Sequence, residues 1–424
     1  MLTLNEGKGK FVDFLAQKAD IVVRYNGGNN AGHTINANGI KYKFKLMPSG
    51  APLEKEGVIA NGCVVDPKVL LEEIENLKKL RKKINLKLSS TAHVIFPFHR
   101  ILDGLEEKTK GNYAAGTTKR GIGPAYSDKA ARWGLRIFDL INPKILKPKL
   151  EKLFKIKKEL INVYDPSWNV DLEAIYEEYK SYGEQLKPYV VDTAYYLNKA
   201  IDYGKKVLFE AAQGSLLGLD HGYYPFGTSS NANALGISAG TGIPPKKINK
   251  IIGIVKAYTS RVGEGKFPTE LFNDTADKIR EQGHEYGTVT GRPRRVGWLD
   301  LFNIQYGIMI NGVDKVIITL LDALQGINPI KICIGYKLNG KELESWPIQS
   351  EIIEDCKPIY KTFEGWEEKT REEWLDIARS GYNAVPETMK IYIQKIGEIL
   401  KTNIAMVSIG PDRKETIVIE DVEF

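Results

Sequence analysis

The sequence lacks the features that mark membrane, secreted and disulfide-stabilised proteins. Its longest apolar runs, such as Ile251 to Val255, are strand-sized and far short of the ~18 residues of a membrane helix. The N-terminus has no apolar signal region and no cleavage site, so no secretion signal is expected. Cys63, Cys333 and Cys356 lie far apart, which argues against a disulfide framework and against a structural zinc site. We therefore expect a soluble, cytoplasmic protein with no membrane partner.

Low-complexity tracts and Ser/Pro-rich linkers are also absent, and the excess of positive charge is modest. In 424 residues, 60 lysines and arginines face 53 aspartates and glutamates, which gives a net charge of +7. Much of the excess lies in two lysine-rich stretches, 78–87 and 144–158, and a nucleic-acid surface is one interpretation. We favour solvated helix faces, because Leu146, Leu150 and Leu153 recur at helical spacing between the lysines. No nucleic-acid partner is therefore expected.

What the sequence does contain is an alternation of apolar strand-like runs with helical stretches. The runs that we interpret as buried strands are 19–25, 206–210, 250–258, 315–321 and 404–409. Helical spacing marks 151–182 and 387–400. This alternation predicts an α/β fold, with residues 1–424 forming a single large domain around a central, mostly parallel sheet flanked by helices. Small antiparallel additions are expected, among them a hairpin over Ile332–Leu343 that turns at Asn339-Gly340.

Glycine-rich loops that carry cations and hydroxyls are the clearest indication of function. A helix that starts at Gly7-Lys8-Gly9-Lys10 suits a phosphate, although the standard G-x-x-x-x-G-K-[ST] loop is not matched. Segment 26–34 follows a strand, where α/β sheets bind ligands, so His33 is a candidate acid near a phosphoryl oxygen. A capping or core histidine is the alternative interpretation. Three more places offer hydroxyls, amides and arginines suited to anions: 116–124, 210–214 with 228–231, and 290–295. Together these loops predict an enzyme acting on several anionic ligands.

Several of these loops belong to motifs that resemble one known family. In chain order the motifs are EGKGK (6–10), VVRYNGGNNAGHT (22–34), GTTKRGIGPAYSDKAAR (116–132), QGSLLGLDHGYYPFGTSSN (213–231), VKAYTSRVGEGKFPTE (255–270), TGRPRRVGWLD (290–300) and SIGPDR (408–413). On these motifs, which are spread over nearly the whole chain, the sequence resembles adenylosuccinate synthetase. The resemblance implies a P-loop-NTPase-like α/β fold and a cytoplasmic homodimer. It also implies a magnesium-dependent ligase of AMP biosynthesis, which joins IMP to L-aspartate with GTP and gives adenylosuccinate, GDP and phosphate.

The resemblance also assigns roles to individual residues. In the family a base removes the N1 proton of IMP, O6 attacks the γ-phosphate of GTP, and the aspartate amine displaces phosphate from 6-phosphoryl-IMP. His33 then becomes the acid at the leaving oxygen, Gln213 and position 5 are also catalytic, and the Gly32 carbonyl and position 5 hold magnesium. The implied ligand contacts are Asn30, Thr118, Gln213, Thr228, Arg292 and, from the neighbouring subunit, Arg132 for IMP; Val289, Thr290 and Arg292 for aspartate; and Lys8, Gly9, Arg294, Asp322, Ser408 and Gly410 for GTP.

One catalytic position breaks the family pattern. Where the family has an aspartate that is both base and magnesium ligand, this chain has Asn5, whose amide is a poor base and a neutral, weaker ligand. Only four residues precede Asn5, so the first central strand is expected to be missing. Three explanations are open. The chain start is assigned too late, the protein is a non-catalytic nucleotide-binding paralogue, or it makes 2-aminoadenylosuccinate from (d)GMP. We favour the IMP ligase. Smaller departures are Leu320 for a lysine, Gly218 for an aspartate and Pro293 for an arginine.

Overall fold

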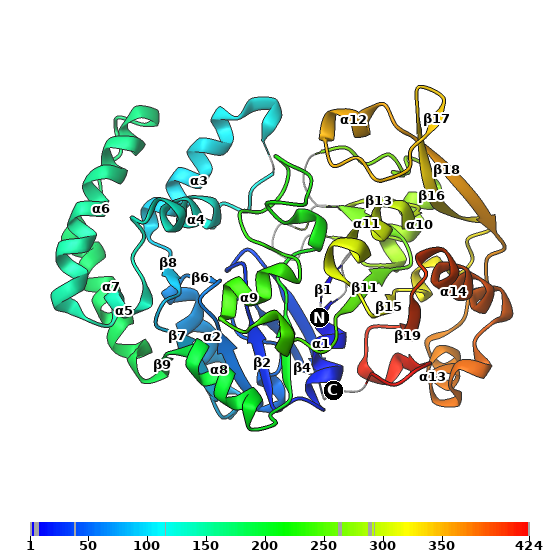
Figure 1. Cartoon of the computed structure of the whole chain (residues 1–424), viewed down its shortest axis with the longest axis horizontal. Helices are drawn as coiled ribbons and strands as arrows, with labels where there is room; N and C mark the ends of the chain where they lie inside the picture. The colour runs from blue at the N-terminus through cyan, green and yellow to red at the C-terminus, as the bar shows by residue number, and fades with distance from the viewer. Residues whose placement is uncertain are drawn as a thin grey trace.

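Two five-stranded sheets form the centre of the protein (Figure 1). The computed structural model describes residues 8–35, 40–114, 116–261, 265–286, 291 and 293–422, and the backbone of residues 2–3 and 36–37. The first sheet has the order β1 (Leu2–Thr3), β11 (Ile252–Lys256), β15 (Lys315–Thr319), β19 (Asn403–Ser408) and β20 (Thr416–Val418). The second has the order β10 (Val207–Glu210), β2 (Ile21–Arg24), β5 (Glu56–Ile59), β7 (Leu86–Ser89) and β9 (Val190–Val191). Only β19 and β20 pair antiparallel, so the predicted parallel core is confirmed.

Helices surround the two sheets. The longer ones are α1 (Lys8–Ala16), α2 (Pro67–Lys79), α3 (Pro97–Thr109), α4 (Ile122–Ala131), α6 (Pro143–Tyr164), α7 (Leu172–Leu186), α8 (Thr193–Asp202), α10 (Asp274–Gln282), α11 (Leu301–Asn311), α13 (Arg371–Ser380) and α14 (Glu387–Leu400). Shorter helices are α5 (Ile137–Leu140), α9 (Leu235–Thr241) and α12 (Ser350–Glu354). In Figure 1, α3 to α7 gather on the left beyond β7. Within the described residues, none of these helices combines the length and the apolar character that a membrane crossing requires.

Small sheets complete the fold, as the sequence predicted. β16 (Ile330–Leu338) pairs antiparallel with β17 (Lys341–Glu342) and β18 (Lys357–Phe363), and parallel with β14 (Leu299–Asp300). The turn between β16 and β17 is the expected Asn339-Gly340, with φ of 52° and 82°. The other pairs are β3 (His33–Ala37) with β4 (Ile40–Phe44), β12 (Thr259–Arg261) with β13 (Arg295–Gly297), and β6 (Val64–Val65) with β8 (His93–Val94).

Most elements lie where the sequence placed them. The predicted strands correspond to β2, β10, β11, β15 and β19, and residues 387–400 form α14. Stretch 151–182 is divided between α6 and α7, because Pro166 cannot continue a helix and Asp171 caps the next one by accepting from the Glu173 N–H. At the N-terminus, where the first central strand was expected to be missing, the structure has the two-residue strand β1 beside β11.

Helix α1 joins the two sheets through a shared hydrophobic core. Its Phe11, Val12 and Leu15 side chains are buried in one cluster. The cluster's other members include Val22 and Leu208 from the second sheet and Ile254, Ile317 and Met406 from the first. Figure 1 accordingly shows α1 between the two sheets. The position of the start of α1 is therefore fixed relative to both sets of strand ends.

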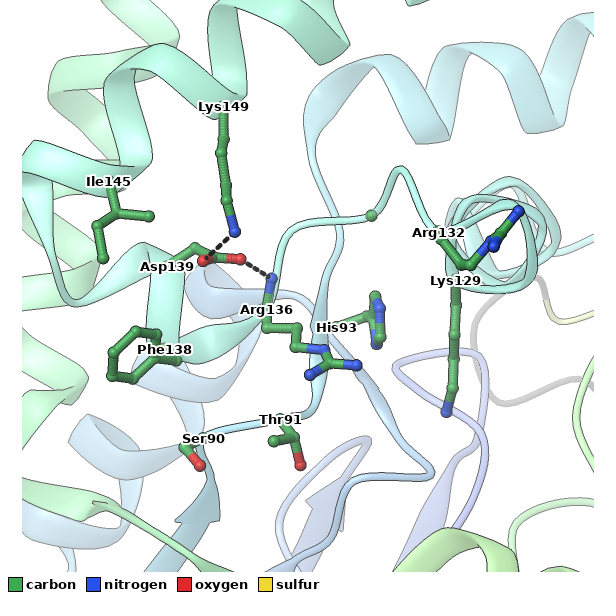
Figure 2. A pocket seen from close by; sticks show the side chains of 11 residues that line it. Ser90, Thr91, His93, Lys129, Arg132, Arg136, Phe138, Asp139, Ile145 and Lys149 are labelled. Atoms are coloured by element: carbon green, nitrogen blue, oxygen red, sulfur yellow. Dashed lines mark hydrogen bonds and ion pairs between the residues drawn. The ribbon is translucent and has the colours of Figure 1, made fainter.

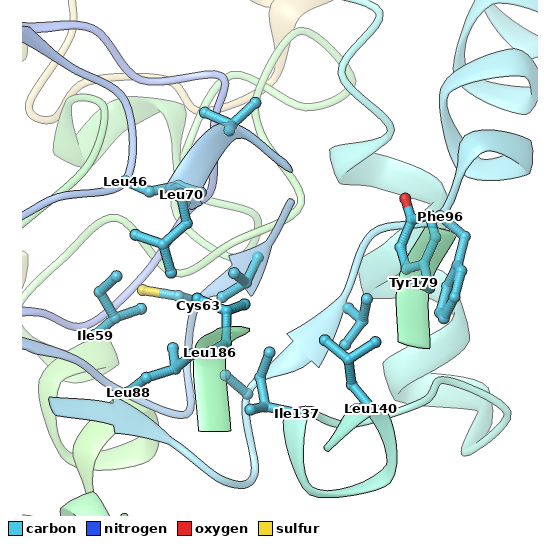
Figure 3. Close-up of a cluster of buried hydrophobic side chains, with 14 of the residues drawn as sticks. Leu46, Ile59, Cys63, Leu70, Leu88, Phe96, Ile137, Leu140, Tyr179 and Leu186 are labelled. Atoms are coloured by element: carbon cyan, nitrogen blue, oxygen red, sulfur yellow. The ribbon is translucent and has the colours of Figure 1, made fainter. Parts of the chain in front are cut away.

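A larger cluster fills the space between the second sheet and helices α2 to α7 (Figure 3). Leu88 of β7 and Leu186 at the end of α7 belong to it, and Phe96 stacks on Tyr179 with ring centroids 4.5 Å apart. Cys63 is buried in the same cluster as a free thiol, and the other two cysteines are also free.

Replacing Phe11 by alanine should destabilise both sheets together. The ring is 0% exposed between them, so Phe11→Ala is expected to lower the free energy of unfolding by about 3–5 kcal/mol in urea denaturation. Phe272→Ala is the matched control, since this ring is 88% exposed and the change should stay within about 0.5 kcal/mol. Equal, small effects of the two substitutions would contradict the shared core.

Candidate active site

The loops that follow β2 and β10 are linked by the buried side chain of Asn26. Its Oδ1 accepts from the Ala212 N–H at 2.8 Å, and its Nδ2 donates to Ala212 O at 3.3 Å and to Ser230 Oγ at 3.1 Å. Because β2 and β10 are parallel neighbours, both loops leave the same edge of the sheet. Three segments singled out in the sequence, 26–34, 210–214 and 228–231, thus meet at one place.

Gln213 and Asn30 flank the same glycine at this edge. Gly27 has a φ of 76°, and a Cβ there would lie 3.1 Å from Gln213 Oε1 and 3.8 Å from Asn30 Oδ1. Gln213 itself has a φ of 56°, a left-handed conformation that costs energy outside glycine. Its Oε1 is buried and has no hydrogen-bond partner among the described residues. A strained residue with an unsatisfied buried acceptor indicates a group that is reserved for a ligand.

The start of α1 lies against these loops. The Lys8 ammonium donates to the carbonyls of Ala211 and Gln213, the latter at 2.9 Å. A Cβ at Gly9 would lie only 2.4 Å from Thr34 O, so glycine is required where α1 passes β3. The predicted phosphate-binding helix start therefore adjoins both the Gln213 loop and the residue that follows His33.

His33 is buried and its Nδ1 is hydrogen-bonded to Glu210. Glu210 Oε1 also accepts from Ser49 Oγ at 2.6 Å, and Oε2 accepts from the Ser49 N–H at 3.0 Å. Burial lowers the pKa of His33 to about 4, with Arg24 and Lys8 adding to the effect and Glu210 opposing it. Burial alone would raise the pKa of Glu210, but His33 and Arg24 hold it below its ordinary value. In the ligand-free protein Glu210 is ionised.

A second group of polar side chains lies at the carboxyl ends of β15 and β19. Lys10 donates to Ser408 Oγ at 2.7 Å and to Gly410 O at 2.8 Å, and the Leu321 N–H donates to Ser408 O. Asp322 Oδ1 is buried, and no described residue makes a hydrogen bond to it. Burial raises the pKa of Asp322 to about 6, although Lys10 opposes the shift. An unsatisfied buried carboxylate oxygen suits a ligand that brings its own N–H donors.

Arg132 lies in a separate, cationic cavity of about 720 Å³ (Figure 2). Lys129, Arg136 and Lys149 also line it, and Lys149 is paired with Asp139 at 2.7 Å. Arg132 is exposed and has a φ of 65°, the left-handed conformation in which helix α4 ends. The lining contains neither His33 nor Gln213, so the structure does not bring Arg132 together with them within one chain.

The remaining predicted residues are placed as follows. Thr118 is exposed in the segment before α4, and the Thr228 N–H donates to Leu217 O at 2.7 Å. Arg294 donates to the buried carboxylate of Glu285 at 2.9 Å. Asn5, Val289, Thr290 and Arg292 lie outside the described residues.

Three residues of this site have no role assigned to them from the sequence: Glu210, Ser49 and Lys10. A carboxylate directly after the apolar run of β10 was a usable signal for Glu210, because a charge at the end of a buried strand needs a partner. Ser49 lies in an ordinary Pro-Ser-Gly turn and gave no signal. Lys10 was seen as one of two lysines at a helix start, but its partners lie about 400 residues away.

The described residues fit a metal ion only if a ligand carries most of its charge. They contain no group of three or more His, Cys, Asp or Glu side chains that could hold a metal ion. Gly32 is exposed and a Cβ there would meet nothing within 4 Å, so there is open space beside this residue. Neutral oxygens of this kind suit Mg²⁺ that is bound mainly through nucleotide phosphates.

Comparison with known proteins identifies the family. The family model described as adenylosuccinate synthetase matches residues 5–417. The chain belongs to the adenylosuccinate synthetase family. It is 47% identical to the adenylosuccinate synthetase of Thermoanaerobacter sp. (strain X514), over 98% of this chain and 97% of that one. The Lactococcus lactis subsp. cremoris (strain MG1363) enzyme is also 47% identical, over 99% and 96% of the two chains.

Two solved structures share the fold of this chain. The fully ligated adenylosuccinate synthetase from Plasmodium falciparum is 40% identical, covers 98% of both chains and superposes with a TM-score of 0.91. The cyanophage S-2L succinoaminodeoxyadenylate synthetase, solved with dGMP and dATP, is 20% identical with a TM-score of 0.60, over 98% of this chain and 93% of that one. This second likeness shows the fold alone.

The structure describes the surroundings of Gly218 and the backbone of Leu320, two residues that depart from the adenylosuccinate synthetase pattern. Gly218 is closely surrounded, since a Cβ there would lie 3.2 Å from Ser215 O and 3.3 Å from Ala232 N. The family's larger aspartate would need these neighbours to move. Leu320 has a φ of 61° two residues before Asp322, a left-handed conformation that costs energy outside glycine.

Proposed function

We propose that this chain joins IMP to L-aspartate with GTP as co-substrate, giving adenylosuccinate, GDP and phosphate for AMP biosynthesis in the cytoplasm. The observation that carries the proposal is the likeness to the fully ligated Plasmodium falciparum enzyme over 98% of both chains. The site supports it, because one helix start contacts both the Gln213 loop and Ser408 at the end of β19. The free cysteines fit a reducing compartment.

In the proposed reaction, O6 of IMP attacks the γ-phosphorus of GTP while the bond to the β,γ-bridging oxygen breaks. Lys8 and the N–H groups at the start of α1 hold phosphate oxygens, and Asn30 and Gln213 hold IMP. His33 gives a proton to the departing oxygen of GDP, and the negative phosphates beside the ring favour its protonated form. The aspartate amine then displaces phosphate from C6, which completes the carbon–nitrogen bond.

The purine N1 proton is the difficult part of this reaction. The family's carboxylate is replaced by Asn5, which has no basic lone pair to take that proton. The carbonyl of Gly32 and the amide of Asn5 would hold magnesium, which when bound balances the charge of the phosphates. We therefore propose a ligase in which the proton donor to the departing GDP oxygen, His33, is intact. The proton acceptor for purine N1, at position 5, is weakened.

We also propose that the whole chain is one domain that works as a homodimer. The cluster beneath α1 draws side chains from both sheets, which supports one domain. Arg132 supports the dimer, because it lines a cavity that does not include His33 and is exposed, where a neighbouring subunit can be reached. The remaining contacts assigned by the resemblance, Thr118, Thr228, Arg292, Val289, Thr290 and Arg294, stay predictions.

Ligation of (d)GMP is the second candidate, and Asn5 is the observation that favours it. Position 5 lacks the carboxylate that the family's IMP ligases carry there, so it does not hold the chain to IMP. The structural relative with the corresponding activity shares only the fold, so the IMP reaction ranks first. A nucleotide-binding paralogue without turnover is the third outcome that the experiments below separate.

A four-way assay tests the role of position 5. GDP release is measured with IMP and with (d)GMP, for the natural protein and for Asn5→Asp. We expect slow IMP turnover that Asn5→Asp raises by about 10²–10⁴, the usual contribution of a general base. Turnover of (d)GMP that is lost in Asn5→Asp would instead establish the second candidate, and no turnover of either substrate would leave only the paralogue.

The affinity for GTP should fall in mild acid. The pKa of Asp322 is raised to about 6, so its carboxylate is ionised above that pH and protonated below it. Only the ionised form accepts from both guanine N1–H and the 2-amino group. We therefore expect KM for GTP to rise as the pH falls through about 6, and Asp322→Asn to remove this dependence and the preference over ATP. Equal use of ATP by the natural protein would contradict the role of Asp322.

Mixed dimers test the shared site. Arg132→Leu and His33→Asn should each abolish most activity, whereas a mixture refolded together should regain roughly a quarter of it by random pairing in a two-fold dimer. In half of the sites of a mixed dimer, His33 comes from one chain and Arg132 from the other. If light scattering shows dimers but the mixture stays inactive, Arg132 does not work across the interface.

A further inference from the structure

We propose that Glu210, supported by Ser49, is the positioning residue that fixes the ring of His33 and leaves Nε2 as the nitrogen offered to the substrate. The inference rests on the proposed function, because it specifies how the proposed acid is held. It concerns two residues to which neither the sequence motifs nor the family resemblance gives a role.

Three segments that are distant in the chain meet at Glu210. Glu210 ends β10, Ser49 lies in the loop after β4, and His33 opens β3, so the contacts span 161 and 177 residues. Glu210 and Ser49 are 0% exposed and His33 is 5% exposed. Oε1 accepts from Ser49 Oγ at 2.6 Å and faces His33 Nδ1, while Oε2 accepts from the Ser49 N–H at 3.0 Å. Both carboxylate oxygens are thereby occupied within the protein.

The direction of these bonds fixes which nitrogen is left. An ionised carboxylate can only accept, so Nδ1 must carry the hydrogen that it shares with Glu210. The Ser49 hydroxyl cannot supply that hydrogen, because it donates to Oε1 and lies 3.4 Å from Nδ1. When a proton passes to the departing GDP oxygen it therefore leaves from Nε2, and the Nδ1–H bond to Glu210 stays in place. A carboxylate that sets the tautomer and orientation of a functional histidine is a recurring device.

A purely structural role for Glu210 is the competing explanation, and the chain offers a matched control for it. Glu73 is a second buried carboxylate, and it anchors the residues just before Ser49. It accepts hydrogen bonds from the backbone N–H groups of Lys45 at 2.5 Å, Leu46 at 3.2 Å and Met47 at 2.8 Å. None of its hydrogen bonds involves His33. Loss of Glu73 therefore reports on the anchoring of residues 45–47 without altering the ring.

The first experiment observes the ring directly and needs no activity. Imidazole ¹⁵N–¹H spectra of the full-length protein are recorded, and His33→Asn identifies the His33 signals among those of the five histidines. We expect the hydrogen of His33 on Nδ1 in the natural protein, and a loss of this preference in Glu210→Gln but not in Glu73→Gln. A His33 ring that carries its hydrogen on Nε2 alone would overturn the inference.

The second experiment measures whether Glu210 acts through His33. We expect Glu210→Gln to lower kcat at least about tenfold with KM values nearly unchanged, Glu210→Asp to restore part of it, and Glu73→Gln to leave kcat near that of the natural protein. In a His33→Asn background, Glu210→Gln should have no further effect. An undiminished effect in that background, or an equal loss in Glu73→Gln, would overturn the inference.

Two further readouts keep the test decisive. If Glu210→Gln does not fold, Ser49→Ala replaces it, because the carboxylate then keeps the Ser49 N–H and loses only the hydroxyl. Its smaller loss of kcat must likewise vanish in the His33→Asn background. Failure of the proposed function is seen separately. A natural protein that lacks ligase activity but carries the His33 hydrogen on Nδ1 refutes the function. An active protein in which the effect of Glu210→Gln persists in the His33→Asn background refutes the inference.

Discussion

The active-site architecture depends on two lysines at the start of α1. Residues two apart on a helix point in different directions, so Lys8 and Lys10 cannot serve the same neighbour. Lys8 reaches the carbonyls of Ala211 and Gln213 after β10, whereas Lys10 reaches Ser408 and Gly410 after β19. One helix turn thereby sets the distance between the two sheets' ligand loops. A reaction that transfers a phosphoryl group from one bound nucleotide to another needs that distance to be constant.

Two buried carboxylates that the protein satisfies, Glu210 and Glu73, contrast with Asp322. Glu210 and Glu73 each receive several donors from the protein itself, which offsets the cost of burying their charge. Asp322 differs, because its Oδ1 has no partner among the described residues and its pKa is raised to about 6. Glu210 and Glu73 stabilise the fold around them, and the unsatisfied Oδ1 of Asp322 can accept hydrogen bonds from a ligand. The same contrast separates Asn26, which links loops, from Gln213, which keeps an unpaired oxygen.

The sequence predicted the fold well where the signal is local. Apolar runs gave five of the strands in the two central sheets, helical spacing gave α14, and Asn339-Gly340 gave the turn of the β16 hairpin. The loop residues His33 and Gln213 could be found because glycines follow strands there. The partners of these residues could not, because the Glu210–His33 contact depends on how the β3–β4 pair lies across the end of β10. No property of a window around Ser49 encodes that arrangement.

The buried group around His33 bears on the meaning of Asn5. A carboxylate buried without a functional reason is costly, and apolar residues of similar size are often neutral or stabilising in its place. Yet Glu210, Ser49 and His33 are all present, mutually bonded and almost fully buried. A chain that only bound nucleotides would have no physical need for a histidine held in one orientation. The intact proton-donating half therefore favours a working ligase, altered at position 5, over a paralogue that has lost its chemistry.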